Sequence, residues 1–265
     1  MPFSHLSRND CLVRRRLQGC QDLYRTTPVH LRRLGLGYTN PSLEKHMNAL
    51  DHLSLTAPSN VGAFLVRVQQ TAIRHGVSLV ISDQPYVPYP GSSMDVSGYF
   101  IDRPRRELAV GTGKPVEEWL PTFVHESCHM DQWAEDAPVW NRVMVEGREA
   151  VDWLDEWVNG REDLPCSLQE LADRVRAVEL DCERRVVSRI LEYGLPIDVS
   201  EYAQKGNAYC YYYDHLILRR GWYEPGQAPY ERADVWSVAP TTIDPQAAMP
   251  EGLSQAFHRA YPIER

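Results

Sequence analysis

The chain has 265 residues, of which 43% are hydrophobic and 24% charged, and its formal net charge is −8. This length allows one large domain or two small ones with a buried core, and the composition argues against disorder and collagen-like structure. The negative charge disfavours broad nucleic-acid binding. Residues 1–40 nevertheless hold seven arginines against two acidic residues. We therefore treat residues 1–58 as an irregular basic segment that could contact an assembly partner.

The start of the chain has no apolar run typical of a signal peptide, and no stretch of 18 apolar residues occurs. We expect no membrane span and no secretory signal. The six cysteines are irregularly spaced and include no C-x-x-C pair. We therefore interpret them as reduced thiols rather than as a disulfide framework.

After residues 1–58, the first predicted element is a helix over residues 60–75, with Asn60 as its N-cap and Gly76 ending it. A short strand follows over residues 77–82. After a proline-rich loop, two apolar runs separated by Asp102-Arg103-Pro104-Arg105 predict adjacent antiparallel strands. These runs are residues 98–102 and 106–110.

Helices dominate the remainder. They are predicted over residues 116–134, 139–158, 167–193 and 200–220, with a short one over 253–260. Ser167 and Glu170 have the spacing of a capping box, and Gly194 ends the third of these helices. The order of one helix, short strands and then helices favours an α+β fold over a doubly wound sheet.

The most informative motif is H-E-x-x-H, formed by residues 125–129. Residues four apart share one face of a helix, so His125 and His129 are expected to bind one divalent metal ion together. Glu126 is expected beside that ion, where a carboxylate can take a proton from an activated water. The spacing therefore predicts one Zn²⁺ per chain and hydrolysis of an amide bond.

Catalytic zinc has three protein ligands and one open position, so a third ligand is needed. The predicted helix over residues 167–193 has an apolar stripe that contains Glu179, with Glu183 one turn later. A carboxylate on a core-facing stripe is costly unless it is paired or binds a metal. We therefore predict that Glu179 binds zinc and that Glu183 orients His125 or His129 through the ring nitrogen that faces away from the metal.

Three alternatives stay open at this stage. The two histidines could be core side chains satisfied by hydrogen bonds. Glu179 and Glu183 could pair in a buried ion network with nearby arginines, namely Arg176, Arg184 and Arg185. The third ligand could instead be Glu146 or Glu149, on the flank of the stripe in the predicted helix over residues 139–158.

The predicted helix over residues 200–220 carries a run of tyrosines. Tyr209 and Tyr213 are four residues apart and therefore share a face. We predict that one of them donates a hydrogen bond to the oxyanion of the tetrahedral intermediate. The alternative is a tyrosine stripe that only builds the core or an interface.

Together these residues resemble the zincin metallopeptidases, specifically the branch with a glutamate ligand, the gluzincins. That branch combines H-E-x-x-H with a later E-x-x-x-D or E-x-x-x-E motif, matched here by residues 179–183. Residues 98–230 also resemble an uncharacterised group of metallopeptidase-like proteins of bacteriophages and bacteria. The matching segments are residues 123–133, 179–187 and 207–223. Asp131 departs from the zincin pattern, which has a hydrophobic residue at this position.

The resemblance implies a zincin-like domain over residues 59–224, in which a short twisted sheet packs on the active-site helix and a mainly helical part follows. An edge strand of that sheet, either residues 99–102 or 106–110, would bind an extended peptide by strand addition. Residues 225–265 would form a proline-rich tail packed on the domain.

We therefore expect a zinc metallopeptidase with a peptide or protein substrate, located in the cytoplasm or associated with a virion. The first alternative is a non-catalytic metal-binding structural protein, for example of a virion, in which Glu126 would have no use. The second is a nucleic-acid-associated factor that uses the arginine-rich start of the chain.

Overall fold

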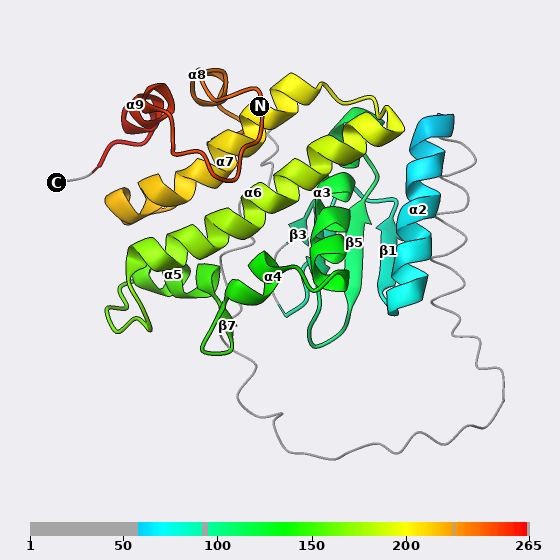
Figure 1. The fold of residues 1–265 in the computed structure, drawn as a ribbon, viewed down its shortest axis with the longest axis horizontal. Coiled ribbons are helices and arrows are strands. Elements are labelled where there is room, and N and C mark those ends of the chain that lie inside the picture. The colour runs from blue at the N-terminus through cyan, green and yellow to red at the C-terminus, as the bar shows by residue number, and fades with distance from the viewer. Residues whose placement is uncertain (1–57, 92–94, 225, 264–265) are drawn as a thin grey trace, which may run out of the picture.

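The computed structural model describes residues 58–91, 95–224 and 226–263 (Figure 1). Its architecture is α+β, as predicted, with a small mixed sheet and long helices. The expectations for the basic segment before residue 58 lie outside the described residues. No helix within the described ranges is long and apolar enough to cross a membrane.

Helix α2 covers Ser59–His75 and ends at Gly76, whose φ of 66° is left-handed and suits glycine. The prediction that Asn60 caps this helix is wrong, because the helix begins directly after Pro58 without a side-chain cap. The Asn60 amide instead donates a 2.5 Å hydrogen bond to the carbonyl of Gly194. It therefore ties the start of α2 to the end of α6 (Leu168–Tyr193).

The main sheet contains β1 (Ser78–Ser82), β4 (Gly98–Ile101) and β5 (Glu107–Gly111), in the order β1-β5-β4. β1 pairs with β5 in parallel, and β4 pairs with β5 antiparallel, as predicted for the latter two. Because β5 lies between the other two strands, it cannot supply a free edge, and the expectation of an edge at residues 106–110 is wrong. β4 is the outer strand on its side.

Two very short strands, β2 (Val87–Pro88) and β3 (Asp95–Val96), form a separate antiparallel pair. β2 lies in the segment predicted as a loop.

Helix α3 covers Val116–Ala134, with the predicted bounds, and packs on β4, β5 and α6. Gly98 permits the close approach of α3 to the sheet. A Cβ atom there would lie 2.8 Å from the carbonyl oxygen of Ala109 and 2.9 Å from Cγ2 of Thr122. The glycine therefore fixes how near the motif helix comes to β4.

The prediction of one helix over residues 139–158 is wrong. The segment folds as α4 (Pro138–Arg142), the strands β6 (Met144–Val145) and β7 (Arg148–Glu149), and α5 (Ala150–Val158). The strands form a hairpin whose two turn residues, Glu146 and Gly147, have φ values of 49° and 79°. Positive φ at both positions is typical of a tight hairpin turn and incompatible with a continuous helix.

Helices α6 and α7 (Val199–Arg219) run side by side in Figure 1. The Ser167 hydroxyl caps α6 by accepting from the backbone N–H of Glu170 at 3.1 Å, which is one half of the predicted capping box, while the Glu170 carboxylate accepts from Arg174. Gly194 ends the helix in a left-handed conformation, as predicted. The Asp198 carboxylate caps α7 in the same way. The short helix α8 (Ala233–Trp236) was not predicted, and α9 covers Glu251–Ala260.

Two apolar cores flank α6. One lies between α2, the main sheet, α3 and the C-terminal half of α6. The other joins α5, the N-terminal half of α6, α7 and α9. Because α6 belongs to both, it holds the two parts of the molecule together and carries Glu179 and Glu183 past α3.

Candidate metal centre

Three side-chain atoms from α3 and α6 converge at one point. The Nε2 atoms of His125 and His129 lie 3.1 Å apart, and Oε2 of Glu179 lies 3.6 and 3.5 Å from them. Ligand atoms bound tetrahedrally at about 2.0–2.2 Å from zinc are about 3.3–3.6 Å apart. The spacing of the three atoms therefore fits one zinc-sized ion.

The second nitrogen of each imidazole is held by an oxygen of the protein. Nδ1 of His125 lies 3.3 Å from Oε1 of Glu183, and Nδ1 of His129 lies 2.8 Å from Oε1 of Gln132. An imidazole whose Nδ1–H donates to such an oxygen presents a free lone pair at Nε2. Both rings are therefore oriented for metal binding through Nε2.

Gln132 is completely buried and has its own partners. Its Nε2 donates to the carbonyl of Val178 and to Oδ2 of Asp181, both at 2.9 Å. These two bonds fix the direction of the amide, so its oxygen must face His129. The amide can only accept from His129, which places the ring proton on Nδ1.

Glu126 lies beside the three converging atoms. It is buried, and the backbone N–H of Phe100 in β4 donates to its Oε2 at 2.9 Å. Burial raises the pKa of this carboxyl group, the two histidines oppose that effect, and the charge of Glu179 adds to it. A carboxyl group with a raised pKa is suited to accept and return a proton near neutral pH.

The ion-pair partners of Glu179 and Glu183 are the two histidines. No lysine or arginine within the described ranges forms an ion pair with Glu126, Glu179 or Glu183. Oε2 of Glu179 and Oε2 of Glu183 are both buried without a hydrogen-bond partner. Burial alone would lower the pKa of His125, but the carboxylates of Glu183, Glu126 and Glu179 raise it to about 10. The carboxylates that favour a proton on His125 would equally favour a metal ion.

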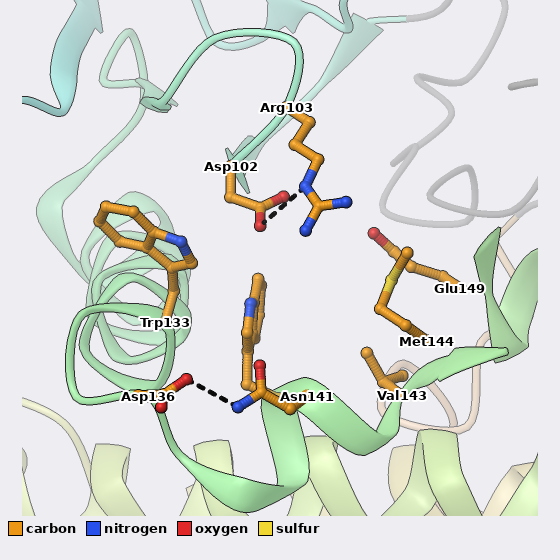
Figure 2. Close-up of a pocket in the computed structure, with 9 residues that line it drawn as sticks. Asp102, Arg103, Trp133, Asp136, Asn141, Val143, Met144 and Glu149 are labelled. Atoms are coloured by element: carbon orange, nitrogen blue, oxygen red, sulfur yellow. Dashed lines mark hydrogen bonds and ion pairs between the residues drawn. The ribbon is translucent and has the colours of Figure 1, made fainter. Parts of the chain in front are cut away.

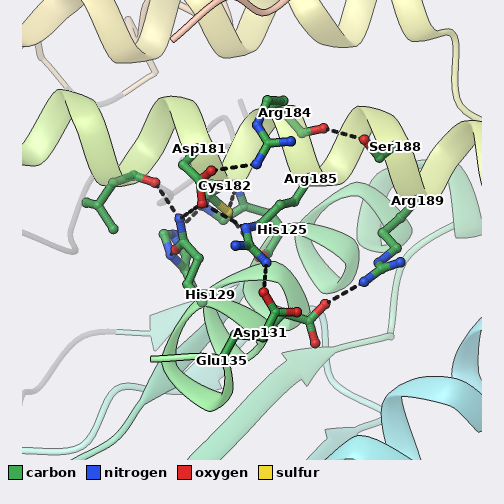
Figure 3. A network of polar contacts seen from close by, with 12 residues as sticks. His125, His129, Asp131, Glu135, Asp181, Cys182, Arg184, Arg185, Ser188 and Arg189 are labelled. Atoms are coloured by element: carbon green, nitrogen blue, oxygen red, sulfur yellow. Dashed lines mark hydrogen bonds and ion pairs between the residues drawn. The ribbon is translucent and has the colours of Figure 1, made fainter. Parts of the chain in front are cut away.

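The arginines considered as partners for the two glutamates pair elsewhere. Arg176 pairs with Asp173 and Asp214. Arg184 and Arg185 both pair with Asp181 (Figure 3). The structure therefore does not show the alternative ion network of Glu179 and Glu183.

Cys182 also belongs to the cluster. One ligand atom from each of His125, His129 and Cys182 can be chosen so that all lie within 4.8 Å of one another. The thiol, however, lies 3.7 Å from Nδ1 of His125, on the side of the ring that faces Glu183. Burial raises the pKa of the Cys182 thiol well above its ordinary value. Glu179, in contrast, faces the Nε2 atoms of both histidines.

The other predicted site residues occupy neighbouring positions. Glu149 lies in β7 and lines a cavity next to the cluster, and Glu146 is at the exposed turn of the hairpin. The hydroxyl oxygens of Tyr209 and Tyr213 lie 3.0 Å apart. Burial, and then the charge of Glu179, raise the pKa of both tyrosines, so both stay protonated donors near the cluster.

Sequence reasoning did not identify Gln132 or Gly206. A Cβ atom at Gly206 in α7 would lie 3.1 Å from Cδ of Glu183, so the glycine leaves room for that carboxyl group. Gln132 lies three residues after His129, on the same side of α3, and this spacing was the available signal.

Comparison with family models, with curated proteins and with solved structures found no match for this chain.

Proposed function

We propose that this protein is a zinc-dependent metallopeptidase with a zincin-like fold. His125, His129 and Glu179 would hold the metal, and one observation carries the proposal. Three potential ligand atoms lie 3.1–3.6 Å apart, beside carboxylates that pair with no arginine or lysine of the described residues. The sequence places Glu126, a general base by position, directly after the first of these histidines.

A zinc ion bound there would acidify a water molecule and polarise the carbonyl of the scissile bond. Glu126 would take the proton from the attacking water and deliver it to the leaving amine. Tyr209 or Tyr213 would donate a hydrogen bond to the oxyanion. Because their hydroxyl groups are hydrogen-bonded to each other, one of the two keeps its proton available for that purpose.

Strand β4 is suited to align a peptide at this site. It is the outer strand of the main sheet, and the N–H of Phe100 points away from β5 toward Glu126. A substrate added along this edge would run past the carboxylate that acts as base. Residues 99–102 therefore remain the proposed peptide-binding edge.

The test is substitution of Glu126 by glutamine. The Glu126→Gln variant should retain about one zinc per chain by elemental analysis and lose hydrolysis of a peptide library. Glu117→Gln, at an exposed position on the same helix, is the matched control and should keep both properties. Unchanged hydrolysis in Glu126→Gln would contradict the proposed role.

Cys182 gives specific support to a second candidate, a non-catalytic structural metal site closed by its thiolate as an additional ligand. Cobalt substitution separates the two functions, because a cobalt–thiolate bond gives an intense charge-transfer absorption. The peptidase proposal predicts no such band in the wild type. A band that disappears in Cys182→Ser would favour the structural site.

A further inference from the structure

A small cavity adjoins the candidate metal centre, between the end of β4 and the segment from α4 to β7 (Figure 2). Its volume is about 110 Å³. Typical pockets for whole ligands have about 300–1,000 Å³. The cavity therefore has the size of a subsite for one side chain rather than of a complete binding site. The residues that matter in its lining are Asp102, Arg103, Trp133, Asp136, Trp140 and Glu149.

Trp140 connects this cavity to the metal centre. Its ring centroid lies 5.9 Å from that of His129 and 5.7 Å from that of Phe100. Asp102 directly follows β4, two residues beyond the N–H that contacts Glu126. Two residues of a strand span about 6.6 Å, so a peptide along β4 would reach the cavity within one or two residues of the reacting bond.

The lining is acidic and aromatic. Among the described residues of the lining, Asp102, Asp136 and Glu149 carry carboxylates and Arg103 carries a positive charge. The ion pair of Arg103 with Asp102 is weak, because Nε of Arg103 lies 3.7 Å from the Asp102 carboxylate and the Arg103 side chain is 74% exposed. Asp136 accepts a 2.7 Å hydrogen bond from the amide of Asn141. Indole rings combined with carboxylates are the chemistry that binds ammonium and guanidinium groups.

We propose that this cavity is a specificity subsite for a lysine or arginine side chain next to the scissile bond. The proposal rests on the proposed peptidase function, since it assumes a peptide aligned along β4. The indole of Trp140 would contact the apolar stem of the side chain, and Glu149 and Asp102 would bind its charged end. The cavity thus gives the peptidase a preference for basic peptides.

Hydrolysis of matched peptides tests the preference. The peptides carry arginine, citrulline or glutamate at each position around the scissile bond. The wild type should give a higher kcat/KM for arginine than for citrulline at one position.

Glu149→Gln should reduce the ratio of the arginine to the citrulline kcat/KM roughly tenfold, the expected loss for one hydrogen bond to a charged group. Arg103→Gln removes the competing guanidinium and should increase the ratio. Glu146→Gln, on the same hairpin but outside the cavity, should leave it unchanged.

Binding of agmatine separates this proposal from the peptidase proposal. Agmatine carries a guanidinium but no peptide bond, and its binding to zinc-loaded Glu126→Gln protein can be followed by tryptophan fluorescence and calorimetry. Saturable binding that weakens in Glu126→Gln/Glu149→Gln would support the subsite even if no peptide is hydrolysed. Equal kcat/KM for arginine and citrulline, or agmatine binding unaffected by Glu149→Gln, would overturn it.

Discussion

Two buried polar clusters lie between α3 and α6, and they are built differently. In the first, Asp131 is 2% exposed and pairs with Arg67 of α2 at 2.5 Å and with Arg189 of α6 at 3.2 Å. In the second, Glu179 and Glu183 face two histidines, and no guanidinium of a described residue pairs with them.

In the second cluster the positive charge beside the carboxylates is carried by protonated histidines, and the zinc ion of the proposed function would take the place of those protons. Burying a carboxylate without a partner costs several kcal/mol, so such a group is normally paired, protonated or bound to a metal. Asp131 is the position at which the chain departs from the zincins that its motif resembles, which have a hydrophobic residue there. Here the residue is used to fasten α2 and α6 to the motif helix.

The largest effect is expected for the carboxylate that we propose as the third metal ligand of the second cluster. Glu179→Ala should reduce the zinc content from about one ion per chain to almost none after dialysis, because a ligand is lost. Elemental analysis measures this directly. Glu149→Ala is the matched control and should keep its metal. The opposite outcome, with metal lost only in Glu149→Ala, would make the assignment of Glu179 wrong.

Substitutions in the first cluster, around Asp131, should lower the free energy of unfolding and leave zinc binding unchanged. Asp131→Ala leaves two partly buried guanidiniums without their shared partner, which is expected to cost about 3–5 kcal/mol in the free energy of unfolding. Urea denaturation measures the loss. Glu192→Ala removes an exposed partner of Arg189 and should cost at most about 1 kcal/mol. A large loss of zinc affinity in folded Asp131→Ala protein would show that the two clusters are not independent.

A smaller effect is expected for Gln132, which acts on the metal through His129. Gln132→Leu keeps the approximate volume but removes the acceptor for Nδ1–H, and should weaken zinc binding about 10–100-fold. Competition with a chromophoric chelator measures the affinity. Gln169→Leu changes an exposed glutamine of α6 and should leave it unchanged. Unaltered zinc affinity in Gln132→Leu would remove Gln132 from the site.

The smallest expected effect concerns His215, a buried histidine that is satisfied by a hydrogen bond rather than by an ion pair. His215 in α7 donates from Nε2 to the carbonyl oxygen of Tyr261 at 2.7 Å. Burial lowers its pKa, and the positive groups of His258 and Arg219 lower it further, while the bond to Tyr261 opposes them. The folded state therefore binds the proton less readily than the unfolded chain does.

The sign of the resulting pH dependence follows from this lowered pKa. The contribution of His215 to stability is complete above the ordinary pKa of 6.5 and is lost as the pH falls through the lowered value. Urea unfolding measured above and below pH 6.5 should show that the free energy of unfolding decreases as the pH is lowered. This decrease should be smaller in His215→Gln than in the wild type. His258→Gln, at an exposed position, should retain most of it. An equal decrease in the wild type and His215→Gln would exclude this residue as the cause.

The periodicity of apolar residues was sufficient to predict many of the helices and strands. It failed where a turn interrupts an apolar stripe. The bounds of α3 and the antiparallel pairing of β4 with β5 follow from local patterns, because apolar spacing and proline or glycine signals agree there. In the segment 139–158 the apolar stripe continued through a hairpin. Gly147 was the only local sign of the turn, and its left-handed backbone is decided by the strands it joins.

The sequence by itself determined the candidate pair His125 and His129 and singled out Glu179, because helical spacing and a charge on an apolar stripe are local properties. Tertiary structure alone decided that Glu179 reaches both histidines, and that the nearby arginines have other partners. It also decided that Gln132 and Glu183 orient the two rings. The physical reason is that ligand geometry and charge balance depend on how α3 packs against α6, and no short stretch of sequence encodes that distance.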